Sequence, residues 1–204
     1  MSPIHPIEAA SYRILSARVD LSGWADGPRA VVARVIHATA DLEFAASMMV
    51  DEAAVAAGVA ALRAGAAVVT DVEMTRAAMT GLPAACYLEE VPRLGLEDGL
   101  TRTAAAMRLA AARNPRGAIF AVGCAPTALL ELLSLAEAGE VAPALVVGLP
   151  VGFVGAAEAK EALRRSGLPA ISNVGEKGGS AAAGAAVNAL ARLAADPIAA
   201  PSPH

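Results

Sequence analysis

One histidine inside the chain is the first residue whose type suggests chemistry. His37 lies in the segment ARVIHATAD, whereas His5 and His204 lie near the two ends of the sequence. Imidazole exchanges protons near neutral pH, so His37 has two interpretations: a catalytic acid, or a core histidine with a satisfied hydrogen bond. It lies near the C-terminal end of a predicted helix, where the partial negative charge favours a protonated ring. The residues alone leave this choice open.

A glycine-rich turn offers a second place for chemistry. The segment GEKGGSAAA follows a predicted strand and opens a predicted helix. Gly178 and Gly179 let the backbone approach a ligand, Ser180 can cap the helix, and free N–H groups there suit a carboxylate or phosphate. Lys177 adds a positive charge. A tight turn without a ligand explains the same residues, and neither P-loop spacing nor a GxGxxG motif after a strand supports a nucleotide site.

Other polar residues give weaker signals. Arg102, at the start of a predicted helix, suits either a bidentate pair with a carboxylate or plain solvation. Asp71 and Glu73 suit a carboxylate pair, although a Glu in a first helical turn is ordinary electrostatics. Cys86 and Cys124 lie far apart and are predicted to be free thiols of a reducing compartment. With one internal histidine we expect no His-rich metal site, and no Ser-His-Asp set can be assigned.

The composition predicts one globular domain. The chain has 204 residues, of which 56% are hydrophobic and 18% charged. A net charge of -4 and 3% aromatic residues provide neither a basic stripe nor stacking platforms for nucleic acid. No signal-peptide pattern and no apolar run of membrane-spanning length are present, so we expect a cytoplasmic protein. The domain is predicted to span residues 1–195, followed by a flexible tail at 196–204.

The periodicity of apolar residues predicts helices before the first strand. Helices are predicted over residues 6–19, from about 28 to 41, and over 51–65. The first helix is predicted to turn Ile7, Ile14 and Leu15 inward, and Gly65 is predicted to end the third.

Short β-branched runs then alternate with helical segments. They are residues 66–71, 117–123, 144–150 and 169–175, with a further candidate at 85–90. This alternation predicts an α/β fold: a mostly parallel, Rossmann-like sheet with helices on both faces and an N-terminal helical segment. Ligands of such sheets bind beyond the carboxyl ends of the strands. The site is therefore expected among residues 71–75, 123–127, 148–155 and 175–180.

Six segments, in this order, resemble the precorrin isomerase (precorrin-8X methylmutase) family of cobalamin biosynthesis. They are RVIHATAD, TDVEMTRAAM, TRTAAAM, VGCAPTALLELL, PALVVGLPVGFVGAAEAKEAL and GEKGGSAAAGAAVNAL. The resemblance covers about residues 6–194. It implies an isomerase that moves a methyl group from C-11 to C-12 of a tetrapyrrole, precorrin-8X or cobalt-precorrin-8, to give hydrogenobyrinate or cobyrinate. It also implies a homodimer with its site near the interface, and an intramolecular reaction without a cofactor.

The resemblance assigns roles to individual residues. His37 matches the family's proton donor, which makes the conjugated macrocycle electron-poor and so eases the methyl shift. Ser11 and Arg102 match substrate-binding positions. Lys177 and the N–H groups of Gly178, Gly179 and Ser180 are inferred as further contacts to the substrate's carboxylates.

Two positions depart from the family pattern. Cys124 stands where the family usually has Asn, and Glu176 stands where it usually has Arg or a similar residue. Glu176 would repel a substrate carboxylate held by Lys177. Two other functions remain as alternatives: a corrinoid-binding protein that sequesters the pathway product without turnover, and an unrelated Rossmann-type enzyme that binds a nucleotide.

Overall fold

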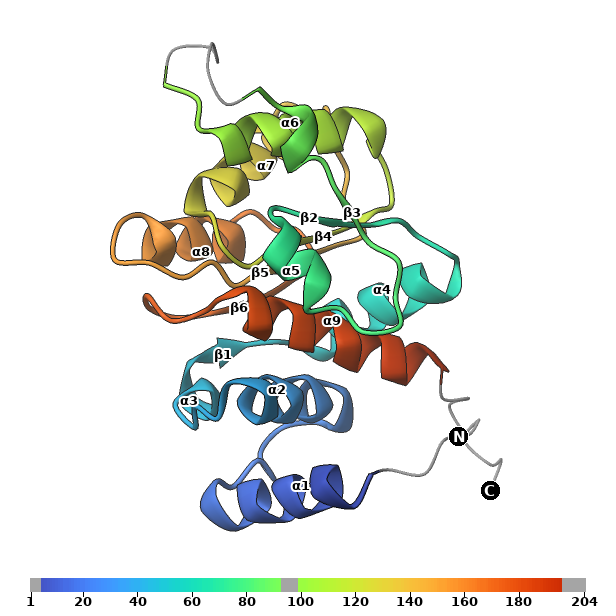
Figure 1. Ribbon diagram of the computed structural model, residues 1–204, viewed down its shortest axis with the longest axis vertical. Coiled ribbons are helices and arrows are strands. Elements are labelled where there is room, and N and C mark those ends of the chain that lie inside the picture. Colours follow the sequence, from blue (N-terminus) through green and yellow to red (C-terminus); the bar gives the residue numbers. More distant parts are fainter. Residues whose placement is uncertain (1–4, 93–98, 196–204) are drawn as a thin grey trace.

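A six-stranded sheet forms the centre of the computed structural model, which describes residues 5–92 and 99–195 (Figure 1). Its strands are β1 (Met48–Met49), β2 (Val68–Thr70), β3 (Ala85–Cys86), β4 (Ile119–Val122), β5 (Leu145–Gly148) and β6 (Ala170–Asn173). Their order across the sheet is β1-β6-β5-β4-β2-β3. All neighbours are parallel except β1 and β6. The predicted mostly parallel sheet is therefore confirmed.

The two edge strands were the least visible in the sequence. Of the candidate run at 85–90, only its first two residues form β3, and Leu88–Glu90 form the short 3-10 helix η1. The strand β1 was not predicted, because two residues cannot show a periodicity of two. It pairs Met48 with Asn173 and Met49 with Ser172. This pairing brings the chain that follows the N-terminal helices to the carboxyl end of β6.

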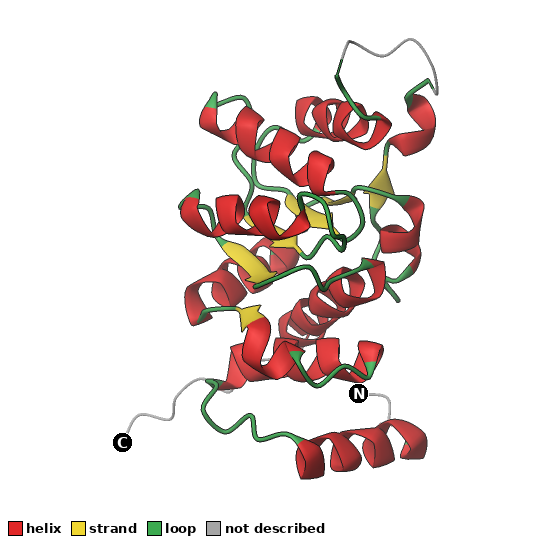
Figure 2. Ribbon diagram, turned by 90° about the vertical axis from the view of Figure 1, so that its left-hand side faces the viewer, coloured by secondary structure: helices red, strands yellow, loops and turns green. Residues whose placement is uncertain are grey.

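Helices cover both faces of the sheet (Figures 1 and 2). They are α1 (Pro6–Arg18), α2 (Asp26–Thr39), α3 (Phe44–Ser47), α4 (Glu52–Arg63), α5 (Glu73–Ala77), α6 (Arg102–Arg113), α7 (Pro126–Glu137), α8 (Ala156–Arg165) and α9 (Ser180–Ala195). Alternate residues of β4 face opposite cores. Ile119 and Ala121 join a cluster with α2, α4 and α9, whereas Phe120 and Val122 join one with α6, α7 and α8. This alternation is the pattern of a sheet buried on both faces.

The N-terminal helices form extra layers outside α9. Helix α2 packs on α9, and α1 packs on α2 at one end of the molecule (Figure 1). The prediction that Ile7 and Ile14 point inward is wrong, since they are 74% and 55% exposed, and only Leu15 of α1 is buried. Because α1 lies at the periphery, only a narrow strip of it is covered.

Other boundaries follow the sequence closely. Helix α2 begins at Asp26, slightly before the predicted Pro28, and α4 is capped by the Asp51 side chain. Gly65 follows the end of α4 with a φ of 74°, as predicted for a helix end. In the described parts of the chain, no helix is long and apolar enough to cross a bilayer. The predicted tail at 196–204 lies outside the described residues.

Candidate active site

Two neighbouring residues of α1 hold His37 in the last turn of α2. Its Nδ1 lies 2.9 Å from the Ser11 hydroxyl oxygen. Its ring stacks on Tyr12, with the ring centroids 4.8 Å apart and the planes 9° from parallel. Within the described residues, no hydrogen bond involves Nε2. The imidazole is thus fixed in position and plane, with one nitrogen left for proton exchange.

The contact with Ser11 suits a proton donor. A hydroxyl oxygen accepts a hydrogen bond from Nδ1–H both in the protonated imidazolium and in the neutral ring that keeps its Nδ1 proton. The proton that leaves is then the one on Nε2. Ser11, predicted as a substrate-binding residue, contacts His37 Nδ1, and its contact with a substrate stays a prediction. Tyr12 was missed, because the sequence gives no signal for a contact between side chains of α1 and α2.

Lys177 connects the turn after β6 to the segment that follows His37. Its Nζ lies 2.7 Å from Asp41 Oδ2 and 2.9 Å from Glu43 Oε2. The hydrogen bond from Lys177 lowers the pKa of Asp41, and the same contact raises the pKa of Lys177. The structure therefore brings the predicted turn and the His37 segment together. It also shows that two carboxylates already neutralise the lysine, and its contact with a substrate carboxylate stays a prediction.

Residues 174–179 form a turn that is tied to the chain after β5. Gly179 N–H donates to the Leu149 carbonyl at 2.8 Å, and Gly152 N–H donates to the Glu176 carbonyl at 3.1 Å. A β-carbon on Gly178 would lie 2.7 Å from the Pro150 carbonyl oxygen, so only glycine fits there. Of the predicted backbone donors, Gly179 N–H is thus already used. The N–H groups of Gly178 and Ser180 make no hydrogen bond within the described residues.

A buried carboxylate joins three loops at the carboxyl edge of the sheet. Asp71, directly after β2, accepts hydrogen bonds from the backbone N–H groups of residues 123–125, at 2.7 to 3.2 Å. It also accepts one from the Thr75 hydroxyl at 2.8 Å, and that hydroxyl lies 2.9 Å from the Ser180 hydroxyl. Ser180 was predicted to cap α9, but its hydroxyl instead pairs with Thr75. Asp71 thus binds the N–H groups of the three residues directly before α7, a helix that starts without a side-chain cap.

The predicted carboxylate pair does not form. Asp71 is buried and accepts hydrogen bonds from backbone N–H groups, whereas Glu73 accepts a hydrogen bond of 2.6 Å from Arg76. Both cysteines are free thiols, as predicted. Burial, and then the nearby Asp71 charge, raise the pKa of Cys124, so this thiol stays protonated.

Arg102 lies apart from the His37 cluster. Its guanidinium donates to the backbone carbonyls of Val91 at 3.1 Å and Leu88 at 2.6 Å. It lines an open hollow of about 420 Å³ together with Glu73, and neither His37 nor the 174–179 turn lines that hollow. The arginine therefore fixes the chain around η1, and its pairing with a substrate carboxylate stays a prediction.

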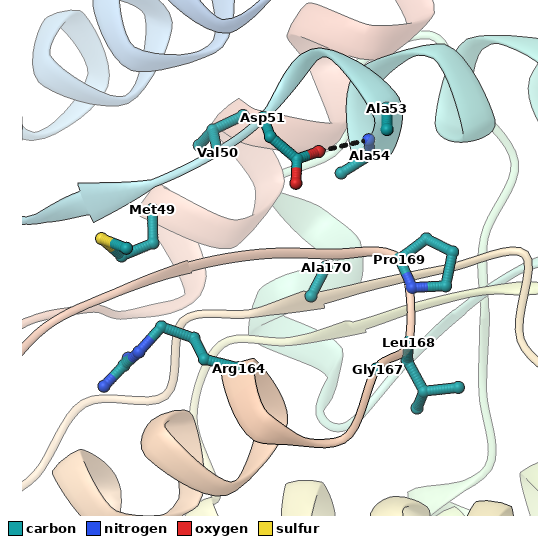
Figure 3. A pocket seen from close by; sticks show the side chains of 10 residues that line it. All are labelled: Met49, Val50, Asp51, Ala53, Ala54, Arg164, Gly167, Leu168, Pro169 and Ala170. Atoms are coloured by element: carbon teal, nitrogen blue, oxygen red, sulfur yellow. Dashed lines mark hydrogen bonds between the residues drawn. The ribbon is translucent and has the colours of Figure 1, made fainter.

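Three larger hollows lie elsewhere on the surface of the described residues. One of about 560 Å³, between α1, α2 and α9, is lined by Tyr12 and Arg34 and so borders the histidine's stacking partner. Another, of about 460 Å³, lies at the amino end of β6 (Figure 3). It contains none of the predicted site residues, and its Asp51 carboxylate accepts the Ala54 N–H at the start of α4. The third, of about 690 Å³, lies between α1 and α2 and is also lined by Tyr12, so two hollows adjoin the candidate site.

The comparisons with known proteins agree on one family. The family of precorrin-8X methylmutases matches residues 6–193. A cobalt-precorrin-8 methylmutase of Priestia megaterium is 41% identical over 201 residues, covering 92% of this chain and 87% of that protein. A precorrin-8X methylmutase of Pseudomonas aeruginosa is 42% identical over 191 residues, covering 89% and 91%. The crystal structure of a precorrin-8X methylmutase from Thermus thermophilus superimposes with a TM-score of 0.82 at 38% identity, covering 92% of this chain and 95% of that one.

Proposed function

This chain belongs to the precorrin-8X methylmutase family of isomerases in cobalamin biosynthesis, and we propose that His37 is the proton donor for its methyl shift. The single observation that carries the proposal is the imidazole held by Ser11 and Tyr12 with Nε2 free among the described residues. The substrate is precorrin-8X or its cobalt form. The product is hydrogenobyrinate or cobyrinate.

The proposed methyl shift requires one proton, delivered to the conjugated macrocycle. Migration of a methyl group from C-11 to C-12 rearranges the macrocycle without any change in its atoms, so no redox partner is consumed. A proton delivered to the conjugated system from His37 Nε2 makes the ring electron-poor and favours migration. When the methyl group has moved, the same proton returns to Nε2. The imidazole is therefore regenerated in each turnover.

Local donors explain how an acidic protein binds an acidic substrate. The net charge is -4, so no long-range attraction assists the peripheral carboxylates. We assign their binding to Lys177, to the free N–H groups of Gly178 and Ser180, and to Arg102. Ser11 acts through His37. Lys177 exchanges its contacts with Asp41 and Glu43 for the substrate carboxylate.

Conversion of the substrate tests the proposal directly. Purified protein is mixed with precorrin-8X and, separately, with cobalt-precorrin-8, and the absorbance spectrum is followed. We expect the spectrum to change to that of hydrogenobyrinate or cobyrinate with catalytic amounts of protein. A change that stops at one equivalent of tetrapyrrole per site would instead support the corrinoid-binding alternative.

Removal of the Ser11 hydroxyl is expected to impair the chemical step. In Ser11→Ala the imidazole loses the partner that fixes its Nδ1 proton, so we expect kcat to fall about tenfold, within the range typical of positioning and acid–base effects. KM for precorrin-8X stays within about twofold, because His37 and not Ser11 faces the substrate. Steady-state kinetics measure both. A selective rise in KM would return Ser11 to the role of a substrate-binding residue.

We propose that the enzyme is a homodimer in the cytoplasm with residues 1–195 as one domain. Large apolar side chains are exposed on two surfaces: Phe153 and Val154, 91% and 88% exposed, between β5 and α8, and Ile7 and Ile14 on α1. Ile7 and Ile14 are seven residues apart and so share one helix face. Light scattering after size-exclusion chromatography is expected to give twice the mass of one chain. Phe153→Asp is expected to shift this equilibrium toward the monomer, and a monomeric wild type would contradict the proposal.

A further inference from the structure

Lys160 is a charged side chain that the proposed mechanism has not used. We propose that Lys160 is a positioning residue that holds the 174–179 turn in its carboxylate-binding conformation and supplies the positive charge beneath it. This inference rests on the proposed function. It extends the function to a residue on α8 that does not contact the substrate.

The geometry links Lys160 to the backbone of the turn. The side chain is fully buried. Its Nζ lies 3.0 Å from Asn173 Oδ1 and 2.5 Å from the Lys177 carbonyl oxygen. Asn173 Nδ2 donates to the same carbonyl at 2.9 Å, and Arg164 donates to the Asn173 carbonyl at 2.6 Å. Two buried side chains therefore converge on the peptide that precedes Gly178.

The buried ammonium group of Lys160 is energetically unfavourable if its sole role is to donate a hydrogen bond to a carbonyl. Burial of a charge disfavours folding unless the charge is paired, and no described carboxylate hydrogen-bonds Lys160. The Asn173 amide already satisfies the Lys177 carbonyl, so a neutral residue at position 160 would leave that carbonyl bonded. The ammonium also has three protons for two described acceptors. What it adds is a positive charge that is not neutralised by an ion pair.

That charge lies where the substrate's carboxylates are expected. Lys177 is neutralised by Asp41 and Glu43, so the positive potential beneath the turn comes from Lys160 together with Arg164. Burial, and then repulsion from Arg164, lower the pKa of Lys160 to about 8, while Glu176 in the turn opposes this shift. At pH 7 most molecules therefore carry the charge, and they lose it as the pH rises through about 8. A bound carboxylate favours the charged form and delays this loss.

The test compares Lys160→Met with Arg165→Met. The first variant keeps most of the stem and removes the charge, whereas the second removes an exposed charge from the same helix. We expect KM for precorrin-8X to rise about tenfold in Lys160→Met, because the charge beneath the turn no longer attracts the substrate's carboxylates, with kcat within about threefold of wild type. Arg165→Met is expected to match the wild type. Hydrogen exchange at residues 174–179 is expected to be faster in Lys160→Met only.

A pH profile gives a second measurement that needs no variant. The wild-type KM is expected to rise between pH 7 and 9.5, because the Lys160 charge is lost over that range, whereas the KM of Lys160→Met stays flat. A KM within twofold of wild type in Lys160→Met overturns the inference, and so does a flat wild-type profile if that variant does not fold. A wild type that fails to convert precorrin-8X contradicts the proposed function instead. In that case the same comparisons are made on the dissociation constant of hydrogenobyrinate.

Discussion

Replacement of His37 with alanine is expected to lower kcat for precorrin-8X by about 10²- to 10⁴-fold, the contribution typical of a positioned proton donor. The loss falls on the chemical step, because Nε2 is the nitrogen left free by the contacts with Ser11 and Tyr12. Binding of hydrogenobyrinate is expected to stay within about threefold of wild type, since the carboxylate contacts lie on other residues. Single-turnover absorbance measurements give the rate, and a titration of the product gives the affinity.

The matched histidine control is His204→Ala at the last position of the chain. This variant is expected to keep the wild-type rate. Full turnover by His37→Ala would contradict the role of His37 as the proton donor. A parallel loss of product binding in His37→Ala would show that the histidine binds the macrocycle, which is the result that the non-catalytic alternative predicts.

Replacement of Asp71 with alanine is expected to cause the largest loss of stability. The carboxylate accepts hydrogen bonds from the N–H groups of residues 123–125 and from Thr75, and it is buried. Without it these buried donors have no acceptor, at a cost of about 1–3 kcal/mol for each unsatisfied group before relaxation. We expect the free energy of unfolding to fall by about 3–5 kcal/mol in total. Urea denaturation followed by circular dichroism measures the change.

An exposed acid provides the control for this measurement. Asp26, whose side chain is 93% exposed, pairs with Arg29 in the same helix, so Asp26→Ala is expected to cost about 0.5 kcal/mol or less. Asp71→Asn is expected to lie between the two, because an amide keeps one acceptor oxygen but adds donors toward the N–H groups. Stability of Asp71→Ala within about 1 kcal/mol of wild type would contradict the assigned role.

The sheet and most helices could be predicted because their signals are local. The runs that became β2, β4, β5 and β6 are β-branched and end in glycine or polar residues, and each lies within its predicted range. The burial of α1 could not be predicted in this way. Apolar spacing at Ile7 and Ile14 says that a helix has an apolar face, but not whether another element of the same chain covers it. In this chain α2 covers only the strip around Leu15.

The candidate site was also predictable only in part, namely where the signal is local. Gly178 and Gly179 predicted the turn, because few other residues allow the backbone to approach a neighbouring group so closely. The proton chemistry of imidazole predicted a role for His37. The partners of these residues come from distant segments, and no spacing reports them. Ser11 meets His37 across 26 positions, and Lys177 meets Asp41 across 136. The resemblance to a family identified Ser11 as important, but its contact with the imidazole required the structure.

The carboxylate of Asp71 has a consequence for which molecules this fold admits. The chain order reverses between β2 and β4, and at such a reversal open α/β sheets bind the anionic part of a ligand against a helix start. Here the Asp71 carboxylate binds the three backbone N–H groups that directly precede α7. A nucleotide phosphate would have to displace a buried charge that four hydrogen bonds retain. We therefore expect that a nucleotide does not bind at this position of the sheet edge.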